Sequence, residues 1–176
     1  MRWMTWFVAV AFVGFTKARS AVDAQAAPSP PTSELLDQLV GHWRMVGQVR
    51  GHPVTYDLEA RRILDGRFVE LHMKDVAHPS QYEALVFIGE DTLPKRVLAH
   101  WLDNFGAAYS VPHGQGAISG DTVQFEVRYP VMPFRDTFVF RRMDHTWIFR
   151  LEAGDGHGGW KPFAEYAVRP KVVPSR

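Results

Sequence analysis

The sequence contains no cysteine, which excludes disulfide bridges, zinc–thiolate sites, iron–sulfur clusters, covalent haem attachment and a thiol nucleophile. It also lacks an excess of charge of either sign. The 20 Lys and Arg residues face 19 Asp and Glu, a balance that argues against a strongly basic nucleic-acid-binding protein. A chain of 176 residues, 46% of them hydrophobic, is enough for one globular domain and too short for two.

Long apolar runs are also scarce, and the one that is present lies at the N-terminus, over residues 3–15. Arg2 precedes this run, and a polar stretch after it ends in Ala-Gln-Ala at 24–26. A basic start, a short apolar centre and an A-x-A site are the parts of a secretory signal peptide. The run of 13 residues spans about 20 Å as a helix, against a hydrocarbon core of about 30 Å. We therefore expect residues 1–26 to be a signal peptide and the protein to be exported, periplasmic or secreted; an uncleaved membrane anchor is the alternative.

The expected mature chain has almost no net charge. Removal of residues 1–26 leaves 17 basic and 18 acidic residues, so neither nucleic acid nor stable membrane insertion is expected. Residues 27–32 hold three prolines and predict a flexible tether. We expect one domain over residues 33–170 and a short C-terminal tail over 171–176.

The domain begins with one helical segment and continues with alternating strands. Ser33 is a good N-cap for a short amphipathic helix over 34–40 that Gly41 ends. Beyond it, apolar and polar residues alternate with period two, typical of strands with one buried face. The expected strands are 42–50, 54–64, 67–74, 81–89, 96–103, 105–118, 121–129, 134–142, 146–153 and 160–168.

Short turns such as Asp65-Gly66 connect these strands and favour antiparallel hairpins. A meander of about ten strands exposes two edges unless it closes on itself. We therefore predict an all-β fold, an up-and-down antiparallel barrel of about ten strands with one short N-terminal helix. An immunoglobulin-type sandwich is the alternative, but its Cys-Trp-Cys spacing is missing.

The Gly41-His42-Trp43 sequence at the start of the first strand resembles the lipocalin-like (calycin) barrels. That resemblance implies that Trp43 packs at the closed end of the barrel and that a basic residue of the last strand lies across it. Arg169 occupies the matching position, where a guanidinium over an indole makes a cation–π contact. The two residues are thus expected to form the barrel floor.

Four motifs, at 39–43, 64–70, 100–106 and 160–169, make the chain similar to an uncharacterised bacterial family of exported lipocalin-like domains of unknown function. The resemblance implies a fold but no activity. The nitrobindins, which are haem barrels, are more distantly similar. Their glycine-rich opening is only partly matched and the last strand has no histidine, so we expect neither haem nor another cofactor; His100 is the best axial-ligand candidate if haem does bind.

Aromatic residues gather on one parity of three consecutive strands and predict a ligand site. If that parity faces the barrel interior, the side chains converge into an apolar pocket for a small hydrophobic or amphipathic molecule, or pack into a solid core that leaves the barrel an interaction role. Arg62 is then a candidate anchor for a ligand carboxylate, or a rim residue with its head in water. The aromatic residues are Phe125, Tyr129, Phe138, Phe140, Trp147 and Phe149.

Glu70 and His72 share one parity of the strand at 67–74, and apolar residues occupy the other. If the polar parity faces inward, the pair could act as general acid and base in an isomerase, cyclase or decarboxylase. If Val69, Leu71 and Met73 face inward, the pair is solvated. The eight histidines show no metal-binding spacing, so no metal is expected. The favoured prediction is a ligand-binding protein rather than an enzyme.

Overall fold

A computed structural model describes residues 33–91, 96–110 and 112–172. The predicted signal peptide (1–26), the predicted tether (27–32) and the last four residues of the predicted tail lie outside the described residues. Within the described ranges, no helix combines the length and apolar character that crossing a bilayer requires.

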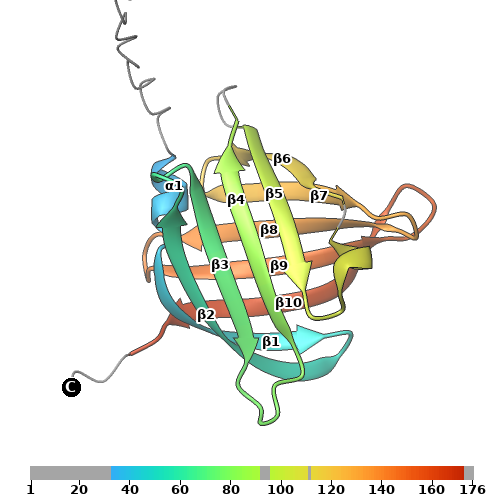
Figure 1. Ribbon diagram of the computed structural model, residues 1–176, viewed down its shortest axis with the longest axis horizontal. Helices are drawn as coiled ribbons and strands as arrows, with labels where there is room; N and C mark the ends of the chain where they lie inside the picture. Colours follow the sequence, from blue (N-terminus) through green and yellow to red (C-terminus); the bar gives the residue numbers. More distant parts are fainter. Residues whose placement is uncertain (1–32, 92–95, 111, 173–176) are drawn as a thin grey trace, which may run out of the picture.

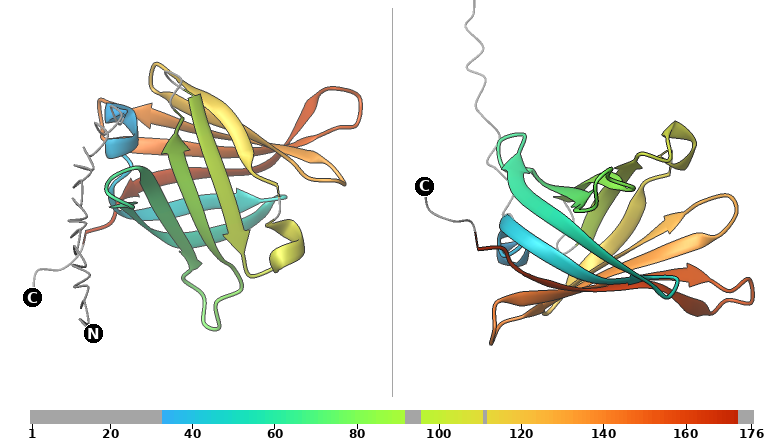
Figure 2. Two further views of the ribbon diagram at one scale, coloured as in Figure 1. Left: turned by 45° about the horizontal axis from the view of Figure 1, so that its top comes forward. Right: turned by 90° about the horizontal axis from the view of Figure 1, so that it is seen from below.

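The described chain forms a closed antiparallel barrel of ten strands, which confirms the predicted fold class (Figure 1). Each strand pairs with its neighbours in sequence, and β1 pairs with β10 to close the ring. In Figure 2, β3, β4 and β5 cross the direction of β7–β10 steeply. The strands are β1 (Gly41–Val49), β2 (His52–Ile63), β3 (Phe68–Asp75), β4 (Glu83–Glu90), β5 (Arg96–Asp103), β6 (Gly114–Ser119), β7 (Thr122–Arg128), β8 (Pro133–Arg141), β9 (Thr146–Gly154) and β10 (Trp160–Pro170).

The sixth strand is shorter than predicted. Instead of 105–118, β6 begins at Gly114, and a 3₁₀ helix, η1 (Ala107–Tyr109), precedes it. The chain leaves β5 because the Asp103 carboxylate accepts a hydrogen bond from the backbone amide of Phe105, 3.1 Å away, and because Gly106 takes a φ of 103°. Both features turn the backbone out of the sheet, and β5 and β6 then pair over only four residues.

A single turn of helix, α1 (Glu34–Asp37), closes one end of the barrel. The Ser33 hydroxyl caps it by accepting from the amide of Leu35, and Leu36 is fully buried. Two indoles bind the carbonyls that follow the helix: Nε1 of Trp43 donates to Leu39 O at 2.7 Å, and Nε1 of Trp147 donates to Gln38 O at 3.2 Å. These bonds attach α1 to β1 and β9 together, so the helix acts as a plug.

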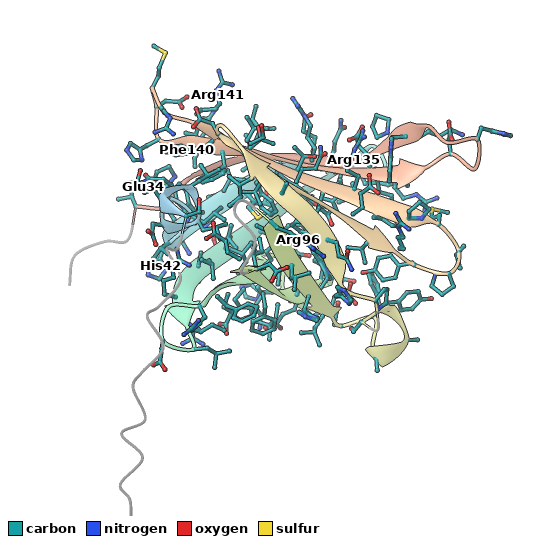
Figure 3. The ribbon with its side chains drawn as sticks, turned by 90° about the horizontal axis from the view of Figure 1, so that it is seen from above. Glu34, His42, Arg96, Arg135, Phe140 and Arg141 are labelled. Carbon is teal, nitrogen blue, oxygen red and sulfur yellow. The ribbon has the colours of Figure 1, made fainter. Side chains whose placement is uncertain are left out.

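Alternate residues of every strand face the barrel interior, and nearly all of them are apolar. In β8, for example, Phe140 is buried whereas Arg141 is exposed (Figure 3). Strand β1 comes very close to β10 at Gly47, where an added Cβ would lie 1.9 Å from the carbonyl oxygen of Glu165. A side chain has no room at this crossing, and the close approach of the first and last strands depends on glycine there.

Candidate functional site

The predicted aromatic residues converge at the α1 end of the barrel, where they pack against one another. The rings of Phe138 and Phe149 stack with their centroids 4.0 Å apart, and Phe140 and Trp147 lie 4.8 Å apart. Phe125 completes the cluster, 6.4 Å from Phe138. All five side chains are buried, so this half of the interior is a packed core.

The opposite end of the barrel differs, because its inward-facing side chains are only partly buried. Tyr129 at the end of β7 lies with its ring 5.9 Å from Phe134, in an edge-to-face arrangement. Phe134 makes a second such contact with Phe163, at 5.0 Å. We call this the open end; Tyr129, the sixth predicted aromatic residue, belongs here rather than to the packed core.

One charged residue, Asp136, lies on the inner face of β8 between these two regions. It is next to Phe134 on that face, and across the sheet it pairs with Phe125 and Leu151. Its side chain is only 2% exposed, and its Oδ1 atom is buried with no hydrogen-bond partner among the residues that the structure describes. Burial raises the pKa of Asp136 to about 8, so the carboxyl group is protonated at neutral pH.

Tyr82, which directly precedes β4, interacts with Asp136 inside the barrel, and Trp101 of β5 is hydrogen-bonded to Tyr82. Nε1 of Trp101 donates to the hydroxyl of Tyr82 at 3.1 Å, and the carboxyl group of Asp103 interacts with both residues. Burial raises the pKa of Asp103, against the hydrogen bonds that favour its ionised form. The pKa of Tyr82 is raised by burial first and then by the nearby carboxylates, including Asp136.

Two further tyrosines complete this group. The ring of Tyr56 lies 5.5 Å from Tyr82 and 5.7 Å from Tyr166, and the hydroxyls of Tyr56 and Tyr166 are hydrogen-bonded. Burial raises the pKa of Tyr129 to about 12, with Asp136 and Asp103 adding to the effect. The phenols therefore stay protonated at neutral pH and can both donate and accept. We call the set the Tyr–Asp cluster: Tyr56, Tyr82, Asp103, Tyr129, Asp136 and Tyr166.

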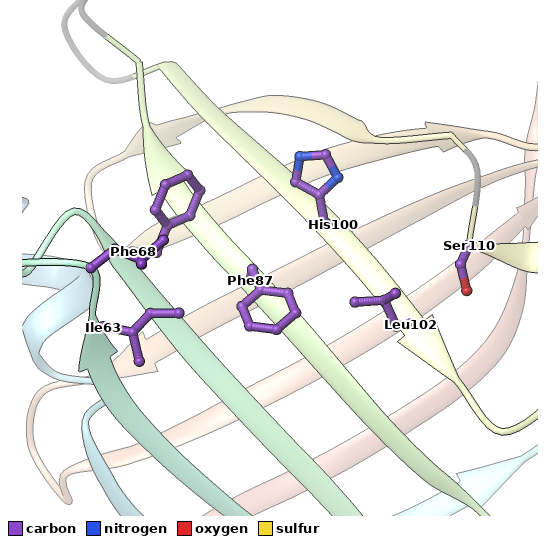
Figure 4. Close-up of a pocket in the computed structure, with 7 residues that line it drawn as sticks. Ile63, Phe68, Phe87, His100, Leu102 and Ser110 are labelled. Carbon is purple, nitrogen blue, oxygen red and sulfur yellow. The ribbon is translucent and has the colours of Figure 1, made fainter. Parts of the chain in front are cut away.

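A separate groove of about 490 Å³ lies on the outside of the barrel, over β2–β5 (Figure 4). It is apolar, with His100 and Ser110 as its polar members. His100 therefore faces outward, with its ring 5.8 Å from that of His113. The lining residues are Ile63, Leu64, Phe68, Phe87, His100, Leu102 and Ser110. Across the described residues, no three His, Cys, Asp or Glu side chains gather to form a metal site.

Residues 29–169 match the family described as "Protein of unknown function (DUF1579)". The chain belongs to this family. No curated protein matches it. Among solved structures, it is similar to Rv2717c from M. tuberculosis, with a TM-score of 0.55 and 11% sequence identity, over 81% of this chain and 100% of that one. At such low identity the likeness concerns the fold alone.

The predicted anchor Arg62 lies at the α1 end of this DUF1579 barrel. Its guanidinium contacts Asp37 of α1 at 2.6 Å and donates to the carbonyl of Gly66 at 3.2 Å. The structure thus places Arg62 where it fastens the plug, on the far side of the packed core from the open end.

Strand β3 faces its apolar parity inward, which answers the question that the sequence left open. Val69, Leu71 and Met73 are buried, and Glu70 and His72 lie on the outer face. There the two polar residues bind different partners. Glu70 forms an ion pair with Arg61 at 2.9 Å, and Nε2 of His72 lies 2.7 Å from Glu83. The Glu–His pair required by the enzyme alternative is therefore not formed inside the barrel.

The barrel floor needs a correction. Trp43 is buried at the α1 end as expected, but Arg169 is exposed and stands opposite Arg44 on the outer face. The described cation–π contacts are those of Arg135 over Trp160 and Arg142 over Phe140, and Arg169 is not among them. The reason is parity, because the neighbouring Val168 takes the inward position. The α1 plug covers Trp43 instead.

Apart from Tyr129, which the sequence predicted as a ligand-binding residue, the members of the Tyr–Asp cluster were missed in the sequence of this DUF1579 protein, although part of the signal was readable. Asp136 shares the parity of Phe134, Phe138 and Phe140, and a carboxyl group on an otherwise apolar strand face is unusual. The other members of the cluster come from β2, β5 and β10 and from the residues next to β4 and β7, and only the closed barrel brings those strands together.

Proposed function

We propose that this protein is an exported binding protein that takes a small amphipathic molecule into the open end of its barrel. The observation that carries the proposal is the buried Oδ1 of Asp136, which has no hydrogen-bond partner within the described part of the chain. Buried polar groups are almost always paired, and each exception needs an explanation. A bound molecule whose polar group reaches Asp136 supplies the missing partner.

The surroundings of Asp136 favour a molecule with an apolar body. Phe134, the neighbour of Asp136 on the inner face of β8, meets the rings of Tyr129 and Phe163 edge to face, and all three rings are only partly buried. Aromatic side chains provide large apolar contact areas at little cost in conformational entropy. A ligand whose apolar body lies among these rings and whose polar group reaches the Tyr–Asp cluster would match the change from an apolar rim to a polar interior.

The outer groove over β2–β5 is the competing location for the same kind of molecule. Its volume of about 490 Å³ and its apolar lining suit a small hydrophobic ligand. However, its polar members His100 and Ser110 lie near the surface, and the groove contains no buried polar group that lacks a partner among the described residues. We therefore place the site at the open end and use the groove as the control.

The experiment is a fluorescence titration of the purified protein with N-phenyl-1-naphthylamine, a neutral probe that becomes bright in apolar surroundings. Leu151→Trp adds bulk beside Asp136 on β9 and should weaken probe binding by at least about 10-fold, because overfilling a packed site displaces its contents. The matched variant Leu102→Gln changes the outer groove and should leave the affinity within about two-fold. Circular dichroism melting checks the folding of each variant.

Tyr129→Ser is a second variant at the open end, in case Leu151→Trp does not fold. It removes a rim ring and should also weaken probe binding. A wild-type protein that binds neither the probe nor any competing amphiphile would overturn the proposal. So would a Leu102→Gln variant that loses binding while both open-end variants keep it.

A further inference from the structure

The charges inside the barrel specify the polar group of the ligand. Resting on the proposed function, we propose that the ligand is a hydrophobic amine whose ammonium group pairs with Asp136 inside the Tyr–Asp cluster. The inference goes beyond binding of an amphipathic molecule, because it excludes fatty-acid-like carboxylates and makes simple alcohols weaker ligands.

The open end has no buried basic side chain, among the described residues, that could pair with an anionic ligand. Of the strand residues of inward parity in the described ranges, only Arg62, His52 and Lys161 are basic; Arg62 pairs with Asp37 at the plugged end, and His52 and Lys161 are exposed to solvent. The open end instead has three carboxyl groups of inward parity, Asp75, Asp103 and Asp136. A carboxylate or phosphate placed beside Asp136 would lack a buried counter-charge and would lie near acids, which is unfavourable in a medium of low dielectric constant.

The Tyr–Asp cluster suits an ammonium group specifically. An ammonium carries only donors, and it needs acceptors on several sides. The free Oδ1 of Asp136 is one acceptor, and the hydroxyls of Tyr129 and Tyr82, which interact electrostatically with Asp136, supply further oxygens. Tyrosine and tryptophan rings also attract cations through their faces, an effect that grows when water is excluded. Tyr56, Tyr166 and Trp101 place such rings within the same part of the barrel.

The burial of Asp136 determines that a proton is released when an amine binds. Without ligand, its carboxyl group is neutral at pH 7, and the titratable groups that interact with it are Tyr82 directly before β4, Tyr129 directly after β7 and Tyr166 on β10; Asp103 on β5 is hydrogen-bonded to Tyr82. When an ammonium enters, the O–H bond of the Asp136 carboxyl group breaks, its proton leaves to solvent, and a carboxylate–ammonium pair forms. Mutual attraction then offsets the desolvation of both charges. Binding of an amine at pH 7 should therefore release close to one proton.

The experiment compares three molecules that share one alkyl chain: decylamine, 1-decanol and decanoate. Each competes with N-phenyl-1-naphthylamine on the wild-type protein and on Asp136→Asn. On the wild type, decylamine should bind at least about 10-fold more tightly than decanol, since a hydrogen bond to a charged group is markedly stronger than one between neutral groups, and decanoate should bind most weakly. Asp136→Asn should lose the preference for the amine and bind decylamine and decanol within about two-fold of each other.

Calorimetry provides a second readout. Titration of decylamine at pH 7 in phosphate and in Tris, whose ionisation enthalpies differ, should show proton release for the wild type and none for Asp136→Asn. If that variant does not fold, Asp136→Ser replaces it. As a matched control, Asp121→Asn changes an exposed acid paired with Arg142 and should keep the wild-type preference and proton release.

The outcomes separate the two proposals. If probe and all three competitors fail to bind, the proposed function falls. If decanol or decanoate binds the wild type as tightly as decylamine, or if Asp136→Asn keeps the amine preference, the barrel still binds amphiphiles and the amine assignment is wrong. Amine preference that disappears with Asp136, together with release of a proton, supports it.

Discussion

Replacing Asp136 with asparagine should change how the stability of the protein depends on pH. In the folded protein burial raises the pKa of Asp136 from its ordinary value of 3.8 to about 8. Between these values the folded state keeps a proton that the unfolded state has released. Raising the pH through this window therefore favours unfolding, and the stabilisation linked to this proton, fully present below the lower pKa, is lost as pH approaches 8.

The size of the effect follows from the width of that window. One pKa unit corresponds to about 1.4 kcal/mol, so the Asp136 contribution to the free energy of unfolding should fall by about 3 kcal/mol from pH 5 to pH 7. An asparagine side chain has no titratable proton in this range, so it adds no pH dependence to the free energy of unfolding. The difference in unfolding free energy between wild type and Asp136→Asn should thus shift by about 3 kcal/mol over these two pH units, in favour of the variant at the higher pH.

Urea denaturation at pH 5, 6, 7 and 8 measures this difference directly, because contributions from other titrating groups are common to both proteins and cancel. Asp155→Asn is the control: backbone amides of His157 and Gly159 hold the pKa of Asp155 below its ordinary value, so it is ionised in both states over this range. The control should reproduce the wild-type slope. Parallel curves for wild type and Asp136→Asn would refute the assignment of a buried, protonated carboxyl group.

Three further predictions concern the plug, the ring closure and the outer face. Leu36→Ala should lower the unfolding free energy by about 2–5 kcal/mol in urea denaturation, because the Leu36 side chain of α1 is fully buried; an unchanged midpoint would show that the plug is dispensable. Gly47→Ala should cost more than about 3 kcal/mol, since its Cβ would lie 1.9 Å from the Glu165 carbonyl, whereas Val46→Ala on the exposed side should cost less than about 1 kcal/mol; similar melting temperatures for the two would contradict the close β1–β10 crossing. His72→Ala should change N-phenyl-1-naphthylamine affinity by less than about two-fold, because His72 lies on the outer face against Glu83, and a large loss would move the site outside the barrel.

Much of the fold was predictable because alternation and turn chemistry are local. The strand that contains Val123 and Phe125 alternates cleanly in the sequence, and the hairpin at Asp65-Gly66 has positive φ angles at both residues, as its composition suggests. The start of β6 was not predictable in the same way. It depends on the Asp103 carboxylate turning the chain at Phe105, a bond that alternation does not encode.

The candidate site was only half predictable for a related reason. The strands β7, β8 and β9 follow one another in the sequence, so the convergence of their aromatic residues could be expected. Parity alone also marks Asp136 as an unusual acidic residue on an apolar strand face. What parity cannot supply is the position of each residue along the barrel axis. That position separates Tyr129 at the open end from Phe140 at the plugged end, and it removes Arg62 from the ligand site altogether.

The junction of β1 with β10 has a consequence for biosynthesis. Nine of the ten strand pairings join neighbours in sequence, whereas this one joins Trp43 to Pro170 and the intervening pairs down to Val49 and Ala164. A nascent chain can thus assemble its hairpins one after another, but two strand edges stay unpaired until the final residues arrive. Any product truncated before Trp160 would lack β10 and keep those edges unpaired. Such a product would be prone to pair its edge strands with those of other chains instead of closing its own barrel.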